Sequence, residues 1–136
     1  MSKSNEEDDL HANCLLCGNC NPLSLHLVFT IDENGEVTAS FKGRQLLQGY
    51  RGMLHGGVIA SLLDSAMTNC LFRHGINAVT GELKVRYRHP VPCSAVLFLR
   101  ARIVSRNQPL YALRSDLEMD GKLMASASAK FMEFCR

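Results

Sequence analysis

Between residues 55 and 72, apolar side chains recur at spacings of three and four, in a 136-residue chain that elsewhere alternates apolar and polar residues. This spacing places them on one stripe of an amphipathic helix. The stripe comprises Val58, Ile59, Leu62, Leu63, Ala66, Met67 and Cys70. Gly75 is a natural helix stop. A helix of this length extends roughly 27 Å, enough to cross a small sheet and bury its stripe there.

The alternating segments predict strands with one buried face. We expect them at residues 25–31, 36–42, 83–88, 97–103, 110–118 and 123–134. Turns at residues 32–35 and 120–121 join two pairs of them into hairpins. The predicted fold is α+β: one domain over residues 11–136, with a long central helix wrapped by a mainly antiparallel sheet of about six strands. A mobile acidic segment at residues 1–10 precedes it.

Composition excludes several classes of function. No apolar run approaches the roughly 20 residues of a membrane-spanning helix, and the acidic start does not resemble a secretory signal. We therefore expect a cytoplasmic protein, without membrane contact and with reduced thiols. A formal net charge of +2 is too small to indicate a nucleic-acid partner.

Small residues share the helix face opposite the apolar stripe, and one acid, Asp64, lies among them. The others are Gly57, Ala60, Ser61 and Thr68. One interpretation is a solvated face that happens to carry an acid. The other is a face on which a second helix or a ligand packs, with Asp64 as a functional carboxylate.

Two glycines, Gly56 and Gly57, occupy the first helical turn, where backbone N–H groups lack partners in the helix. Glycine permits close approach of a ligand, and free N–H groups favour a carbonyl oxygen that gains negative charge. This predicts an oxyanion hole; the alternative is a glycine turn with His55 as a satisfied polar cap. Gly56 and Asp64 are about 12 Å apart along one helix. A shared reaction centre therefore requires Asp64 from a second copy, as in a two-fold dimer.

Three segments resemble the hot-dog-fold thioesterases of the phenylacetate-degradation type: GYRGMLHGGVIASLLD (49–64), TGELKVRYRHPV (80–91) and CLLCGNCNPLSL (14–25). The resemblance implies hydrolysis of an acyl thioester, commonly acyl-coenzyme A, between the subunits of a homodimer that often pairs into a tetramer. It implies that the Gly56 N–H polarises the carbonyl, that His55 shapes the loop, and that Asp64 of the partner acts as base or nucleophile. No cofactor is implied, and the acyl group and its carrier, coenzyme A or an acyl-carrier protein, stay open.

Further residues are candidates for substrate binding. By the resemblance, Gln48 could replace an amide that precedes the His-Gly-Gly run, and Thr80 and Glu82 lie near a water-positioning group; Gly57 is counted with them. The cations at 84, 86 and 88 alternate along one strand. Lys84, Arg86 and Arg88 either contact the phosphates of coenzyme A or form a solvated face.

Two rival hypotheses remain. A hot-dog domain can bind acyl thioesters without catalysis, in which case Asp64 has no chemical task. Alternatively, His11, Cys14, Cys17 and Cys20 recur every third residue with ligand types that zinc prefers, although no second pair of ligands follows. A redox Cys-x-x-Cys is weaker still, because this one precedes a strand. We expect Cys70, Cys93 and Cys135 to be small core residues.

Overall fold

The helix predicted from the apolar spacing is α2, Gly56–Arg73. The computed structural model describes residues 10–134. His55 caps the helix at its start, and Gly75 follows its end with φ +77°, a conformation that glycine adopts without strain. A short 3-10 helix, η1 (Gln45–Leu47), lies upstream of α2.

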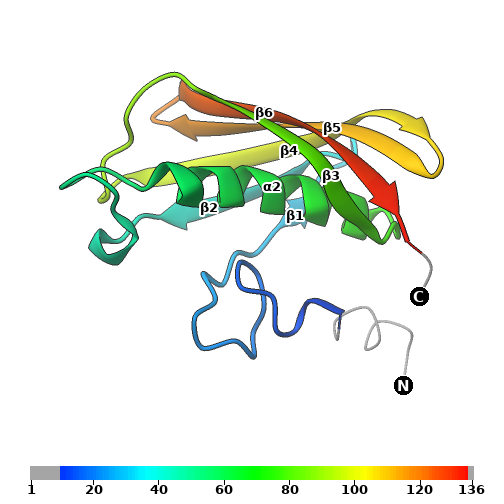
Figure 1. The fold of residues 1–136 in the computed structure, drawn as a ribbon, viewed down its shortest axis with the longest axis horizontal. Coiled ribbons are helices and arrows are strands. Elements are labelled where there is room, and N and C mark those ends of the chain that lie inside the picture. Colours follow the sequence, from blue (N-terminus) through cyan, green and yellow to red (C-terminus); the bar gives the residue numbers. More distant parts are fainter. Residues whose placement is uncertain (1–9, 135–136) are drawn as a thin grey trace.

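Six strands form one antiparallel sheet that wraps around α2 (Figure 1). They are β1 (Thr30–Ile31), β2 (Val37–Lys42), β3 (Ala78–Tyr87), β4 (Val96–Asn107), β5 (Leu110–Met119) and β6 (Lys122–Glu133). Their order in the sheet is β1-β2-β4-β5-β6-β3. The predicted α+β architecture, a long helix wrapped by about six antiparallel strands, is therefore confirmed.

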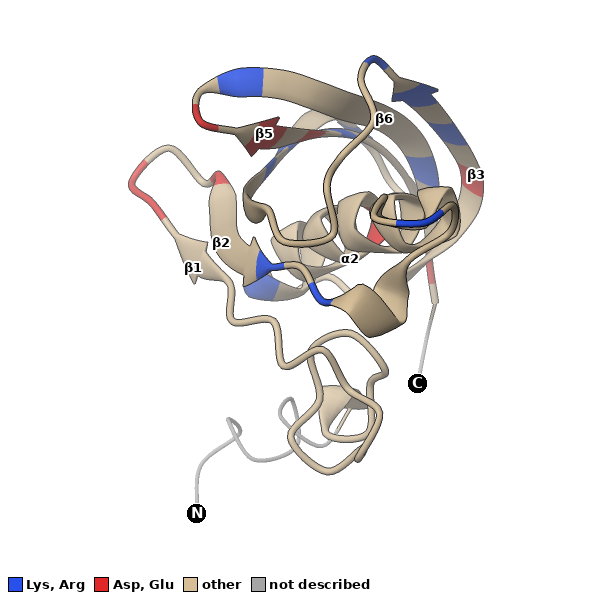
Figure 2. Cartoon of the chain, turned by 90° about the vertical axis from the view of Figure 1, so that its left-hand side faces the viewer, with Lys and Arg blue, Asp and Glu red and all other residues tan. Residues whose placement is uncertain are grey.

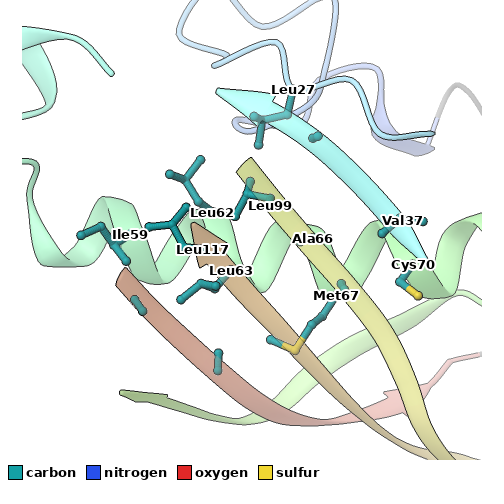
Figure 3. Packing of buried hydrophobic residues seen from close by; sticks show 14 of the residues in the cluster. Leu27, Val37, Ile59, Leu62, Leu63, Ala66, Met67, Cys70, Leu99 and Leu117 are labelled. Carbon is teal, nitrogen blue, oxygen red and sulfur yellow. The ribbon is translucent and has the colours of Figure 1, made fainter. Parts of the chain in front are cut away.

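The core lies between α2 and the concave face of the sheet (Figure 3). The predicted apolar stripe faces it: Leu62, Leu63 and Met67 are fully buried. Leu99 of β4 and Leu117 of β5 lie opposite and are equally buried. Burying one such side chain stabilises the fold by about 1.5–3 kcal/mol, so this stripe fixes α2 against the sheet.

The predicted strand at residues 25–31 is wrong over most of its length, because only Thr30 and Ile31 join the sheet. His26 has φ +54°, which interrupts an extended strand. The N–H groups of Leu25 and Leu27 donate to the carbonyls of Leu15 and Leu16 instead of a neighbouring strand. Residues 25–27 thus pair with the segment before them.

The predicted mobile segment at residues 1–10 lies outside the described residues except for Leu10. Within the described range, no helix is long and apolar enough to cross a membrane.

Candidate active site

The first turn of α2 is built around His55. Its Nδ1 accepts a hydrogen bond from the Gly57 N–H at 2.8 Å, which is the polar cap that the sequence offered as an alternative. Its backbone N–H donates to the Leu47 carbonyl at 2.9 Å. These two contacts hold the turn and give the Gly57 N–H a partner within the chain.

Gly56, the first residue of α2, differs from Gly57 in this respect. Within residues 10–134 its N–H has no hydrogen-bond acceptor, while its carbonyl accepts a bond from the Tyr87 hydroxyl at 2.6 Å. A Cβ at this position would lie 3.6 Å from the Tyr87 hydroxyl, an ordinary contact. The Gly56 N–H is therefore available to a ligand, and the partial positive charge at a helix start favours an oxygen there.

A cavity of about 760 Å³ adjoins this turn. Its walls come from Gly49, Tyr50 and residues 53–56, from Ile59 of α2, and from residues 87–91 at and beyond the end of β3. Most of these side chains are apolar, and Tyr50 and Tyr87 are largely exposed. The space is within the range of small-molecule sites in proteins.

Asp64 is held by a residue of the neighbouring strand. The Thr80 hydroxyl of β3 donates to Asp64 Oδ1 at 2.6 Å. Asp64 is half-buried on the small-residue face of α2, where Gly57 and Ser61 are exposed. This hydrogen bond fixes the direction of the carboxylate.

An irregularity in β3 separates Thr80 from Glu82. Thr80 pairs with the buried Phe131 and so faces α2, whereas Glu82 pairs with the exposed Lys130 on the outer face of the sheet. Residues two positions apart on a regular strand point to the same face of the sheet. Here the register shifts between Thr80 and Glu82, so they point to opposite faces. Glu82 therefore lies away from Asp64.

The cations of β3 are divided in the same way. Lys84 and Arg86 pair with Ser128 and Ser126, which alternate with buried alanines of β6, so both cations lie on the outer face of the sheet. Figure 2 shows the cationic positions of β3 in blue. Arg88, beyond the strand end, lines the cavity. Gln48 is exposed, and its side chain accepts a bond from the Gly52 N–H at 3.1 Å. The structure thus brings Arg88, but neither Lys84 nor Arg86, to the cavity at Gly56.

Sequence reasoning missed Tyr87 and Tyr50 as cavity residues. Tyr87 alternates with the cations of β3, so its side chain points toward α2, where its ring covers Gly56. At the sheet edge, however, the ring is 52% exposed. A tyrosine three residues before Pro90 gave no signal of this in the sequence.

A family model described as the thioesterase superfamily matches residues 51–108, which include α2 and β3. Acyl-coenzyme A thioesterase THEM4 of Bos taurus is 28% identical over 78 residues, covering 57% of this chain and 32% of that protein. The Rattus norvegicus protein of the same name is 33% identical over 67 residues, covering 49% and 29%. The chain spans about a third of the length of these curated relatives.

Solved structures share the fold. A thioesterase superfamily protein is 28% identical with a TM-score of 0.79, covering 85% of this chain and 60% of that one. A Bacillus halodurans protein solved with CoA is 25% identical with a TM-score of 0.73, covering 82% and 76%. A phenylacetic acid degradation-related protein of Ralstonia eutropha, 23% identical, has the same fold (TM-score 0.72; 79% and 85% covered). The hot-dog fold and the resemblance to the thioesterase superfamily are therefore confirmed.

Proposed function

We propose that this chain hydrolyses an acyl thioester carried by coenzyme A to a free acid and a thiol. The observation that carries the proposal is the Gly56 N–H, which has no acceptor within residues 10–134 and opens at the start of α2 beside a cavity of about 760 Å³. An N–H at this place stabilises the oxyanion that forms when water or a carboxylate attacks a carbonyl. The THEM4 relatives, named as acyl-coenzyme A thioesterases, support the same substrate class.

Asp64 of a second copy supplies the attacking group, as general base on water or as nucleophile. It lies eight residues after Gly56 on the same helix, about 12 Å away along the axis. Two α2 helices that cross antiparallel about a two-fold axis beside Ala60 bring each Gly56 to the partner's end near Asp64. The small side chains around Ala60 allow the close approach that this arrangement requires.

The edge of the sheet favours the same dimer. Among residues 10–134, β3 pairs with β6 alone, so its other edge offers ten residues of backbone to another strand. A second β3 on this edge would place the two α2 helices side by side under one continuous sheet. Pairing of two such dimers into a tetramer remains part of the proposal.

Arg88 lines the cavity and is the cation best placed for a phosphate of coenzyme A. Lys84 and Arg86 lie on the outer face, so a contact from them requires a coenzyme that extends over the sheet edge. The Bacillus halodurans relative solved with CoA is consistent with this ligand class.

The test is hydrolysis of aromatic, short, medium and long acyl-CoAs, with released thiol measured after subtraction of the protein's own cysteines. We expect Asp64→Asn to lose about 10²-fold or more in kcat. Asp116→Asn, which changes a carboxylate on the outer face of β5, is the matched control and keeps wild-type rates. If no wild-type activity appears but wild type and Asp64→Asn bind acyl-CoA equally well, the chain is a binding module instead.

A second pair of variants tests the Gly56 N–H itself. Proline at the first helical position is well tolerated, and His55 already has the extended conformation that a following proline requires (φ −61°, ψ 133°). Gly56→Pro therefore removes the N–H while keeping the helix, and Gly56→Ala keeps both. We expect Gly56→Pro to lose about 10²-fold or more in kcat/KM and Gly56→Ala to stay close to wild type.

A further inference from the structure

Three side chains before the sheet lie close together: His11, Cys14 and Cys17. Their ligand atoms, one ring nitrogen and two Sγ, all lie within 4.8 Å of one another. His11 Nδ1 and Cys17 Sγ are 3.5 Å apart. In a tetrahedral zinc site, with Zn–S near 2.3 Å and Zn–N near 2.05 Å, ligand atoms stand about 3.6–3.8 Å apart. The cluster therefore needs shifts of about an ångström at most to surround an ion.

The turn between the two cysteines is shaped for bound thiolates. The Leu16 N–H donates to Cys14 Sγ at 3.4 Å, and the Asn69 amide donates to Cys17 Sγ at 3.8 Å. Gly18 closes the turn where a Cβ would lie only 2.5 Å from the Ala12 carbonyl oxygen and the Cys14 nitrogen. N–H donors to ligand sulfurs are the outer contacts by which proteins orient and tune a metal site.

The cluster is also anchored to the fold. The His11 ring packs edge-on against Phe72 with centroids 4.3 Å apart, and Leu16 and Cys17 pack against the core. Phe72 and Asn69 belong to the last turns of α2, whereas Gly56 is its first residue. The cluster is thus separate from the candidate active site, and it joins the N-terminal segment to the opposite end of the helix (Figure 1).

We propose that His11, Cys14 and Cys17 bind one Zn²⁺, with water in the fourth position, and that this ion holds together the loop of residues 11–17 that packs against the end of α2. Cys20 is exposed and lies outside the group of atoms within 4.8 Å, so it is not a ligand. The role is structural: the ion holds a segment that contributes no strand to the sheet. The proposal is independent of thioester hydrolysis.

The test is the zinc content of the full chain, purified in reducing buffer without chelator and without an affinity tag that binds metal. We expect about one zinc per chain in the wild type and in Cys20→Ser. Cys14→Ser and Cys17→Ser should each lose about ten-fold or more of the bound metal. Zinc below about a tenth of an equivalent in the wild type, even after incubation with excess Zn²⁺ and desalting, would overturn the proposal. So would equal loss in Cys20→Ser, because the ligand set would then differ.

If the serine variants do not fold, titration of the wild type with Co²⁺ tests the metal site directly. Tetrahedral Co²⁺ with two thiolates gives intense visible bands and a sulfur-to-metal charge-transfer band, and Zn²⁺ should abolish both. Bands typical of octahedral Co²⁺, without charge transfer, contradict the site. The site is also contradicted if Cys14 and Cys17 form a disulfide again soon after the protein has been reduced. Mass spectrometry detects this disulfide as the loss of two hydrogens.

Discussion

The hydroxyl of Thr80 is the one hydrogen-bond partner of the Asp64 carboxylate among the described residues, at 2.6 Å. A hydrogen bond to a charged group contributes about 1.5–3 kcal/mol, and loss of about 1.4 kcal/mol of transition-state stabilisation slows a reaction ten-fold. We therefore predict that Thr80→Val lowers kcat about ten-fold or more, with little change in KM. Hydrolysis of the best acyl-CoA from the panel measures both constants.

Thr80→Ser is the control for this prediction, because it keeps the hydroxyl and removes only a methyl group. Thr80 is exposed on an edge strand, so neither change should alter the unfolding temperature appreciably. Equal rates for Thr80→Val and the wild type would show that Asp64 needs no such support.

Cys70 makes the stability of the fold depend on alkaline pH. It is completely buried, and burial, together with the nearby charge of Glu36, raises the pKa of its thiol from 9.0 to about 11. The unfolded thiol ionises first as the pH rises, so this contribution is full below about pH 9 and is lost between about pH 9 and pH 11. Urea unfolding of wild type and Cys70→Ala should show a difference in free energy that shrinks over this interval. A difference independent of pH would contradict the prediction.

Individual site residues were only partly predictable. Gly56, His55 and Asp64 stand out in the sequence because glycines at a helix start, and an acid among small residues, are unusual. The separation of Thr80 from Glu82 was not predictable, because it depends on a shift in register between β3 and β6 that local alternation does not record. Tyr87 was missed for a similar reason: its exposure follows from the place of β3 at the sheet edge.

The small face of α2 is where two copies meet in the proposed dimer, with Ala60 beside the axis. A larger side chain there separates the helices and moves each Asp64 away from the partner's Gly56. We predict that Ala60→Leu weakens the dimer and lowers activity about ten-fold or more, because overpacking a close contact costs about 1–3 kcal/mol. Analytical ultracentrifugation and the hydrolysis assay measure the two effects.

Circular dichroism provides the necessary control for Ala60→Leu. Leucine is a good helix former and Ala60 is only half-buried within the chain, so the helix signal and the unfolding of the monomer should be retained. If Ala60→Leu forms a tight dimer with full activity, the two-fold axis of the dimer does not pass beside Ala60.

Elements were predicted more reliably than single residues. The helix begins one residue later and ends one residue later than its apolar spacing predicted. Five strands overlap the predicted segments, but β3 begins five residues before the predicted residue 83 and β4 ends four residues after the predicted residue 103. The exception, residues 25–29, has a strand pattern because Leu27 and Phe29 are buried. Their backbone partners are elsewhere, however: the Phe29 carbonyl accepts a bond from the Arg73 side chain at 2.7 Å. Alternation of apolar and polar residues therefore indicates which side chains are buried, but not which segments are hydrogen-bonded to each other.

A site shared by two chains makes a prediction for the whole assembly. A mixed dimer of Asp64→Asn and Gly56→Pro chains carries both defects in one site and neither in the other. Coexpression should therefore restore about a quarter of wild-type activity when the chains mix at random, although each variant alone is inactive. Mixing must occur before the dimers form.

The control is the same coexpression with two Asp64→Asn chains, which contains no intact site and should stay inactive. If the complementary pair also remains inactive while mass spectrometry shows mixed dimers, Gly56 and Asp64 of different chains do not share a site.

The position of β3 in the sheet also has a consequence for biosynthesis. In the part of the chain that the structure describes, the strand of Thr80 has β6 as its one partner, and Ala78 pairs with Glu133. A ribosome adds about 5–20 residues per second, so β3 waits roughly 2–9 s after its own translation before β6 is complete. During that interval α2 can already be helical, but its carboxylate has no fixed hydroxyl beside it. A nascent chain stalled before β6 would therefore expose an unpaired β3, a natural target for chaperones.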